Sequence, residues 1–228
     1  MPTIPEPLII FDCDGVLVDS EPISNRVLAD LLTEIGLHTT FSQSIEMFLG
    51  RSWEDTLKII ARRLGKEPPE GLYATYTERL FQTFDSELKP VSGIECVLNQ
   101  LPFPMCVASS GPHEKIQKTL SLTGLLRFFE GNVFSSSDVK KGKPAPDLFL
   151  YACERMGSTP DSSIVVEDAV PGVKAAVSAG MRLIGYAPSN NGPILQSNGA
   201  STFSDMRELP KLLSSTVENK PHGVRYEL

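Results

Sequence analysis

The chain has 228 residues, of which 41% are hydrophobic, and a formal net charge of -7 at pH 7. This length suffices for one sizeable domain, or for one domain with a smaller one inserted into it. The acidic balance and the lack of a basic run argue against nucleic-acid binding, and no stretch predicts a signal peptide or a membrane span. We therefore expect a globular protein with neither a nucleic-acid nor a membrane partner.

The cysteine pattern also excludes some classes. The four cysteines, at 13, 96, 106 and 153, form no Cys-x-x-Cys pair, and three of them lie inside apolar runs. This pattern favours reduced thiols over a disulfide framework or a zinc site. We expect a reducing compartment, the cytoplasm.

The first part of the chain predicts one strand followed only by helices. Residues 8–11 form an apolar run that is typical of a buried strand, and Gly15 ends the pattern. Apolar residues then recur at helical spacing in four stretches, at 23–35, 43–49, 53–64 and 70–87. With no strand signal between them, residues 20–89 are predicted to form an all-helical block.

From residue 92 onward, strands and helices alternate. Strands are predicted at 104–108, 131–135, 163–166 and 181–186, and helices at 92–100, 112–122, 146–156 and 170–179. This alternation indicates the α/β class, with a Rossmann-like parallel sheet covered by helices on both faces. The predicted core domain comprises residues 1–19 and 90–213, the helical block is an insertion into it, and the polar residues 214–228 are expected to form a tail.

Two carboxylates follow the first strand. In the segment Phe11-Asp12-Cys13-Asp14-Gly15 the chain bends, so that both acids can converge on one point. Two like charges that close require a cation between them, a shared proton, or both. The alternative is a strand that ends in a turn with solvated aspartates.

Polar side chains also follow the next three strands. The full set in chain order is Asp12 and Asp14, Ser109 and Ser110, Lys143, and Glu167 and Asp168. Each has a simpler explanation alone, as a turn former, a solvated lysine or a helix-capping acid. Because ligands of open α/β sheets bind beyond the carboxyl ends of the strands, we expect the set to form one site.

The order of these motifs resembles the haloacid dehalogenase-like superfamily. The motifs are Asp-x-Asp-Gly at 12–15, a strand ending in Ser109, Lys-Pro-x-Pro-Asp at 143–147, and Glu-Asp at 167–168. The resemblance covers residues 7–213, and the helical block resembles the α-helical cap of this superfamily. It places the chain with the sugar-phosphate phosphatases and β-phosphoglucomutases.

The resemblance implies a role for each acid after the first strand. Asp12 matches the nucleophile that attacks phosphorus and forms an aspartyl-phosphate. Asp14 matches the general acid and base, and its backbone carbonyl is an expected metal ligand. The metal-free dehalogenases lack this second aspartate, so the resemblance implies phosphoryl transfer.

The remaining motif residues imply a magnesium cofactor and a phosphate-binding site. Asp168 matches a carboxylate ligand of Mg²⁺, and Glu167 either a second ligand or a partner of the ligands. Ser109 and Lys143 match the groups that hold the transferring phosphoryl oxygens, with Ser110 beside them. Asp12 is expected to ligate the metal as well.

The cap sequence bears on the choice between phosphatase and mutase. Where β-phosphoglucomutases carry a hinge histidine this chain has Ser24, and Trp53 replaces the cap arginine that grips a second phosphate. We therefore expect a phosphatase acting on a sugar phosphate or phosphosugar acid, with the mutase as the alternative because Arg51 lies close to the lost position.

Residues 50–53 form the candidate substrate-selecting loop. Trp53 would stack on a sugar ring or belong to the cap core, and Arg51 would pair with an anionic substrate group or remain a surface charge. Gly50 precedes them, and hinges are expected near 19–22 and 89–90. A cap closing at these hinges would exclude water.

A rival of another class is a non-catalytic, magnesium-binding phospho-acceptor or interaction domain. Such a switch needs neither the second acid, Asp14, nor a lid over a small substrate. We expect a monomer whose partner is a small phosphorylated molecule.

Overall fold

The computed structural model describes residues 6–189 and 191–218. Their core is a six-stranded parallel sheet in the order β3-β2-β1-β4-β5-β6. The strands are β1 (Leu8–Phe11), β2 (Met105–Ser109), β3 (Val133–Ser135), β4 (Ser163–Glu167), β5 (Arg182–Tyr186) and β6 (Ser201–Phe203). The chain builds outward from β1 on one side and from β4 on the other, so the topological switch point lies between these two strands.

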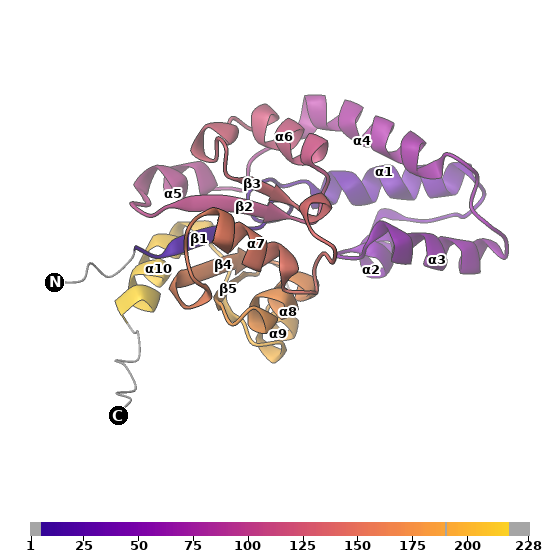
Figure 1. Ribbon diagram of the computed structural model, residues 1–228. Helices are drawn as coiled ribbons and strands as arrows, with labels where there is room; N and C mark the ends of the chain where they lie inside the picture. The colour runs from indigo at the N-terminus through magenta and orange to yellow at the C-terminus, as the bar shows by residue number, and fades with distance from the viewer. Residues whose placement is uncertain (1–5, 190, 219–228) are drawn as a thin grey trace.

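Helices cover both faces of the sheet (Figure 1). They are α5 (Ile94–Gln100), α6 (His113–Leu122), α7 (Asp147–Arg155), α8 (Val170–Ser178), α9 (Gly192–Ser197) and α10 (Leu209–Glu218). Short 3-10 turns lie at Leu126–Phe128, Ser136–Asp138, Pro160–Ser162 and Met206–Glu208. The α/β class and the alternation expected from the sequence are confirmed.

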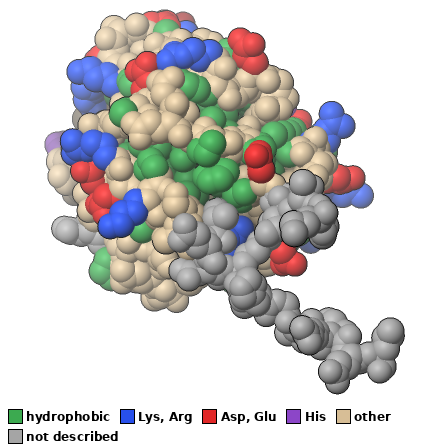
Figure 2. Space-filling model, turned by 90° about the vertical axis from the view of Figure 1, so that its left-hand side faces the viewer, with side chains coloured by type: hydrophobic (Ala, Val, Ile, Leu, Met, Phe, Trp, Pro, Cys, Tyr) green, Lys and Arg blue, Asp and Glu red, His purple; other side chains and the backbone are tan. Residues whose placement is uncertain are grey.

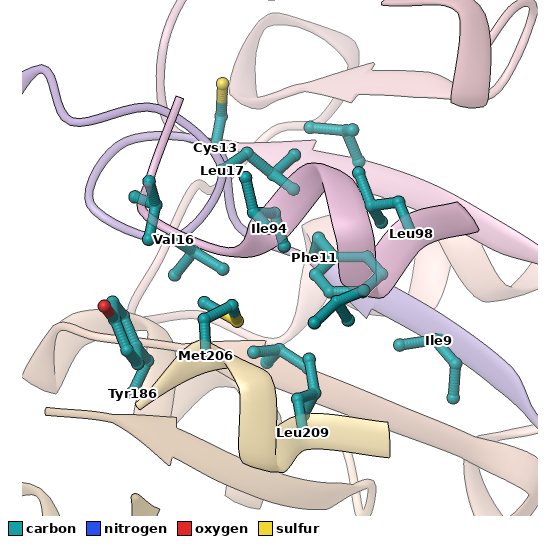
Figure 3. Packing of buried hydrophobic residues seen from close by; sticks show 14 of the residues in the cluster. Ile9, Phe11, Cys13, Val16, Leu17, Ile94, Leu98, Tyr186, Met206 and Leu209 are labelled. Carbon is teal, nitrogen blue, oxygen red and sulfur yellow. The ribbon is translucent and has the colours of Figure 1, made fainter. Parts of the chain in front are cut away.

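The alternation of side chains along the strands divides the core into two layers. Ile9 and Phe11 pack with α5, α6 and α10 on one face, whereas Leu8 and Ile10 pack with α7 and α8 on the other. Figure 3 shows the first layer, in which Phe11 lies between the side chains of α5 and Leu209. All four residues of β1 are buried, as expected for a central strand of a parallel sheet.

The cap consists of four helices placed beyond the carboxyl ends of the strands (Figure 1). These are α1 (Glu21–Glu34), α2 (Phe41–Phe48), α3 (Trp53–Leu64) and α4 (Leu72–Glu87). Their own apolar cluster includes Leu32, Phe48 and Ile60. The two linkers to the core run side by side, because the Asp19 N–H donates to the Lys89 carbonyl at 2.9 Å.

Some element ends differ from the sequence prediction. Helix α2 begins at Phe41, two residues early, because Thr40 and Gln43 form a reciprocal capping box. Helix α10 extends through residues 214–218, which were expected to form a tail, and Leu213 before them is fully buried. The rest of the predicted tail lies outside the described residues. Strand β6 and helix α9 were not predicted, since neither contains an apolar run of useful length.

The face turned away from the cap is shown in Figure 2. Apolar side chains gather near its middle, and charged side chains of both signs are scattered around them. No helix among residues 6–189 and 191–218 has the length and apolar character needed to cross a membrane.

Candidate active site

A cavity of about 640 Å³ lies between the carboxyl ends of the strands and the cap. All ten residues predicted to act on substrate or metal line it: Asp12, Asp14, Gly50, Arg51, Trp53, Ser109, Ser110, Lys143, Glu167 and Asp168. The topology explains the convergence, because parallel strands bring their carboxyl ends to one edge of the sheet. The cap residues reach the cavity from the opposite side.

Lys143 joins the ends of β1 and β4. Its ammonium donates to Asp12 Oδ1 at 2.6 Å and to Glu167 Oε1 at 2.7 Å, and only 3% of its side chain is exposed. Burial opposes the charge on Lys143, but the two carboxylates outweigh burial and raise its pKa. Lys143 is therefore a fixed positive charge beside Asp12.

The carboxyl of Asp12 is costly to ionise in this setting. Burial, together with the nearby charges of Glu167 and Asp14, raises its pKa to about 7 despite the opposing charge of Lys143. The electrostatics therefore favour additional positive charge near Asp12, as expected for a group that would bind a cation or a phosphoryl centre.

Glu167 is held by the backbone that follows it. Its Oε2 accepts the N–H groups of Asp168 and Ala169, each at 2.9 Å, while Oε1 is bound to Lys143. A Cβ on Gly172 would lie 1.6 Å from Oε1, so only glycine leaves room for this carboxylate. These contacts favour the second of its expected roles, as a partner that positions the ligands.

Asp168 lies against the loop after β1. Its Oδ2 sits 2.0 Å from the position that a Cβ of Gly15 would take, so the carboxylate rests on the backbone of that loop. Burial and the negative charges of Glu21, Glu167 and Asp12 raise its pKa well above the usual value. Asp12, which is buried, and Asp168, which is half-buried, are thus two carboxylates that face each other's charge.

The donors that could hold a metal are oxygen atoms. Within the described residues, no three His, Cys, Asp or Glu side chains are already arranged as a metal cluster. The side chains of Asp14 and Glu167 are bound to lysines, and Lys143 also contacts one oxygen of Asp12. Asp12 and Asp168, with the expected Asp14 carbonyl, leave a set of hard oxygen donors that fits Mg²⁺, which commonly takes one or two carboxylates and completes its shell with water and substrate oxygens.

Asp14 has two partners of its own. Lys115 Nζ donates to Asp14 Oδ1 and Oδ2 at 2.9 and 2.8 Å, and the Ser20 hydroxyl donates to Oδ1 at 2.5 Å. Burial by itself would raise the pKa of Asp14, but the charge and hydrogen bonds of Lys115 and the Ser20 bond outweigh it and lower that pKa. Asp12 and Asp14, two residues apart, therefore have pKa values displaced in opposite directions, which suits two different roles.

The two serines after β2 differ in their surroundings. Ser109 is 1% exposed, and its Oγ accepts the Gly111 N–H at 3.2 Å, which leaves its own hydroxyl proton free to donate into the cavity. Ser110 has an exposed side chain, and its carbonyl accepts the Ser136 hydroxyl at 2.7 Å. A substrate contact of Ser110 stays a prediction.

The cap loop approaches the core at Gly50. A Cβ there would lie 3.8 Å from the Cβ of Ala169, so the loop passes directly over the end of β4. Arg51 is exposed and donates through Nε to the Met47 carbonyl at 2.6 Å. Trp53 stacks on Tyr76, with ring centroids 5.1 Å apart, and packs on the cap cluster, which agrees with the cap-core alternative for this residue.

Sequence reasoning missed Lys115, and it placed Ser20 and Glu21 in a hinge and not at the site. All three line the cavity. A signal for Lys115 was present, because it lies in the first turn of a helix that begins just after the Ser109 strand end. The start of such a helix lies at the carboxyl edge of a parallel sheet, although the sequence does not show which of its side chains face the site.

Three comparisons with known proteins find related sequences and structures. The model of the haloacid dehalogenase-like hydrolase family matches residues 9–186. The chain is 32% identical over 209 residues to the 6-phosphogluconate phosphatase of Escherichia coli, covering 90% of this chain and 93% of that protein.

Solved structures show the same fold. A conserved haloacid dehalogenase-like protein of Agrobacterium tumefaciens superposes with a TM-score of 0.83 at 32% identity, over 93% of this chain and 99% of that one. A hydrolase of the same family from Deinococcus radiodurans, solved with bound phosphate and sodium, has a TM-score of 0.79 at 27% identity, over 93% and 97% of the two chains.

Proposed function

The chain belongs to the haloacid dehalogenase-like hydrolase family. We propose that it hydrolyses phosphate monoesters of small metabolites, namely sugar phosphates or phosphosugar acids, with Mg²⁺ as cofactor. The observation that carries the proposal is the contact of Asp12 with Lys143 at 2.6 Å, at the sheet's switch point and under the cap. A buried carboxylate beside a fixed cation provides a nucleophile and a phosphate-binding charge at one place.

In the first step Asp12 attacks phosphorus, the bond from phosphorus to the leaving oxygen breaks, and an aspartyl-phosphate forms. Lys143 and the Ser109 hydroxyl stabilise the negative charge on the phosphoryl oxygens. Asp14 gives a proton to the leaving oxygen. Asp12, Asp168 and the Asp14 carbonyl would hold Mg²⁺, which when bound neutralises charge on the transferring group.

In the second step Asp14 takes a proton from water, and the resulting hydroxide attacks phosphorus and frees Asp12. The contacts of Asp14 with Lys115 and Ser20 favour its ionised form, which is the form this step uses. The first step uses the protonated form, in which one oxygen of Asp14 carries the proton and the other still accepts from Lys115.

We further propose that the protein acts as a monomer in the reducing cytoplasm. The cavity is complete within one chain, and all four cysteines are free, three of them buried. Size-exclusion chromatography with light scattering tests the monomer.

The test of the activity is phosphate release from a panel of phosphomonoesters with Mg²⁺ or EDTA. The panel contains glucose 6-phosphate, 6-phosphogluconate, phosphoglycolate and β-glucose 1-phosphate. We expect Mg²⁺-dependent release that is abolished in Asp12→Asn and unchanged in Asp30→Asn, an exposed aspartate of α1 outside the cavity. Normal release by Asp12→Asn contradicts the mechanism, and isomerisation of β-glucose 1-phosphate without release contradicts the phosphatase assignment.

A further inference from the structure

Lys115 lies at the wall of the cavity, beside the position expected for the leaving group of a substrate. Its aliphatic stem crosses Gly111, where a Cβ would sit 3.4 Å from Lys115 Cδ, and its ammonium lies on Asp14 at the wall of the cavity. Asp14 is the group that would exchange a proton with the leaving oxygen. Lys115 is therefore adjacent to the part of the substrate that departs and not to the phosphoryl group.

The ammonium of Lys115 has a hydrogen-bond donor to spare. A lysine carries three N–H donors. Two of them reach the Asp14 oxygens, at 2.9 and 2.8 Å, and no other acceptor for Lys115 Nζ is found among residues 6–189 and 191–218. Because 21% of the side chain is exposed and the residue lines the cavity, the third donor can reach a bound molecule.

The other cations that line the cavity are placed differently. Lys143 lies between Asp12 and Glu167, on the side of the phosphoryl group. Arg51 and Lys140 are exposed at the rim. Within the described residues, Lys115 is thus the cation of the cavity that contacts Asp14.

The distances limit what Lys115 can bind. A leaving oxygen hydrogen-bonded to Asp14 would lie about 2.8 Å from that carboxylate, and therefore roughly 5 to 6 Å from Lys115 Nζ. Ordinary bond lengths place an oxygen on the neighbouring carbon about 3 Å from the ester oxygen. When it points toward the ammonium, such an oxygen falls within hydrogen-bond distance of the free donor.

We propose that Lys115 binds a hydroxyl or carboxylate oxygen on the carbon next to the phosphorylated carbon, and so selects polyhydroxy and sugar-acid phosphates over simple alkyl phosphates. This inference rests on the proposed phosphatase function and names the substrate feature that the site recognises. A substrate without that oxygen leaves a half-buried ammonium donor unpaired, and sites built to hydrogen-bond a substrate group reject analogues that lack it.

The test uses two substrates that differ by one hydroxyl. Glycerol 3-phosphate carries a hydroxyl on the carbon next to the phosphorylated one, and the monophosphate of propane-1,3-diol does not. We expect the wild-type kcat/KM to favour glycerol 3-phosphate by about ten-fold or more. In Lys115→Met, which keeps the stem and removes the donor, this ratio should fall to about one.

The matched control is Lys118→Met, one turn along α6. Lys118 pairs with Asp85 of the cap and lies outside the cavity lining, so the preference for glycerol 3-phosphate should persist in this variant. Equal losses on both substrates in Lys115→Met, with the ratio intact, would show that Lys115 only positions Asp14 and would overturn the proposal. A wild type that does not distinguish the two esters would overturn it as well.

Two further outcomes, a variant that is too slow to assay and a wild type without activity, can be distinguished from those above. If Lys115→Met is too slow to assay, calorimetric titration of both esters into Asp12→Asn, with and without Lys115→Met, measures the same ratio as dissociation constants. If the wild type releases no phosphate from any ester of the larger panel, the proposed function itself fails, whereas a loss of discrimination with release intact concerns Lys115 alone.

Discussion

Replacing Lys143 by methionine should destabilise the protein more strongly at pH 8 than at pH 5.5. The change keeps the length of the side chain and removes the charge that joins β1 to β4. The lysine makes contacts of 2.6 and 2.7 Å to carboxylates whose side chains are 11% and 2% exposed. Without the lysine, the buried carboxylates of Asp12 and Glu167 lie close together with no positive charge at position 143.

The magnitude follows from these two contacts. A hydrogen bond to a charged group contributes about 1.5 to 3 kcal/mol, so two of them give about 3 to 6 kcal/mol. Breaking a buried ion pair by removing one partner typically costs about 3 to 5 kcal/mol, in the same range. At pH 5.5 the loss is smaller, because Asp12, whose pKa is about 7 even with the lysine present, becomes protonated and leaves one unpaired charge instead of two.

Urea unfolding followed by circular dichroism in EDTA, at both pH values, measures the effect. Lys140→Met is the control, since Lys140 is an exposed cation of the same cavity and should change the free energy of unfolding by no more than about 0.5 kcal/mol. Adding Glu167→Gln to Lys143→Met should recover part of the loss at pH 8. A loss below about 1 kcal/mol, or the same loss at both pH values, would refute the reasoning.

Two further predictions concern the metal-binding side of the site. Gly15→Ala should cost more stability than Gly131→Ala and should raise the Mg²⁺ concentration needed for activity. Both glycines have a left-handed φ, of 79° and 77°, which costs a substituted alanine about 1 to 2 kcal/mol. The new Cβ at 15 would also meet Asp168 Oδ2 at 2.0 Å, whereas the one at 131 meets nothing within 4 Å; equal urea midpoints would count against this placement of Asp168. In EDTA, the free energy of unfolding should fall as pH rises from about 4 to 7. Burial raises the pKa of Asp12 from 3.8 to about 7, so over this pH range the folded state keeps a proton that the unfolded chain has released. The resulting decrease in the free energy of unfolding is at most about 4 kcal/mol. Glu21, whose pKa burial and neighbouring acids also raise to about 7, acts in the same direction. Mg²⁺ should therefore stabilise the protein more at pH 8 than at pH 5 in a thermal-shift assay, and an equal shift at both pH values would contradict the assignment.

The sequence was most informative at the strands, where the run of apolar residues predicts the element and the position after it predicts a site residue. The run Leu8-Ile9-Ile10-Phe11 predicted a buried central strand, and the strand ends pointed to the residues that now line one cavity. The short edge strand β6 and helix α9 escaped prediction for a physical reason. Only Phe203 of β6 is buried, so the strand has no apolar pattern that distinguishes it from a loop.

The sequence predicted which residues belong to the site, but not which of them contact one another. Sequence position predicted that Asp12, Lys143 and Glu167 would meet, but not that Lys143 would contact both acids. Lys115 was missed because a lysine in the first turns of a helix is usually a solvated charge, and only the fold shows that this one faces Asp14. The same holds for Gly172, whose place in α8 gives no sign that its missing side chain makes room for Glu167.

The two lysines show how chemistry and stability are linked at this edge of the sheet. β1 and β4 are buried along their whole length, so their polar continuations gather several carboxylates at one point. The neutralising charges come from other segments: Lys143 from the loop before α7, and Lys115 from α6. Because each lysine is bound to a carboxylate at the switch point, these ion pairs fix α6 and that loop to the central strands. The side of the cavity proposed to bind phosphate and the side proposed to face the leaving group are therefore positioned by two separate ionic contacts, which substitutions can perturb one at a time.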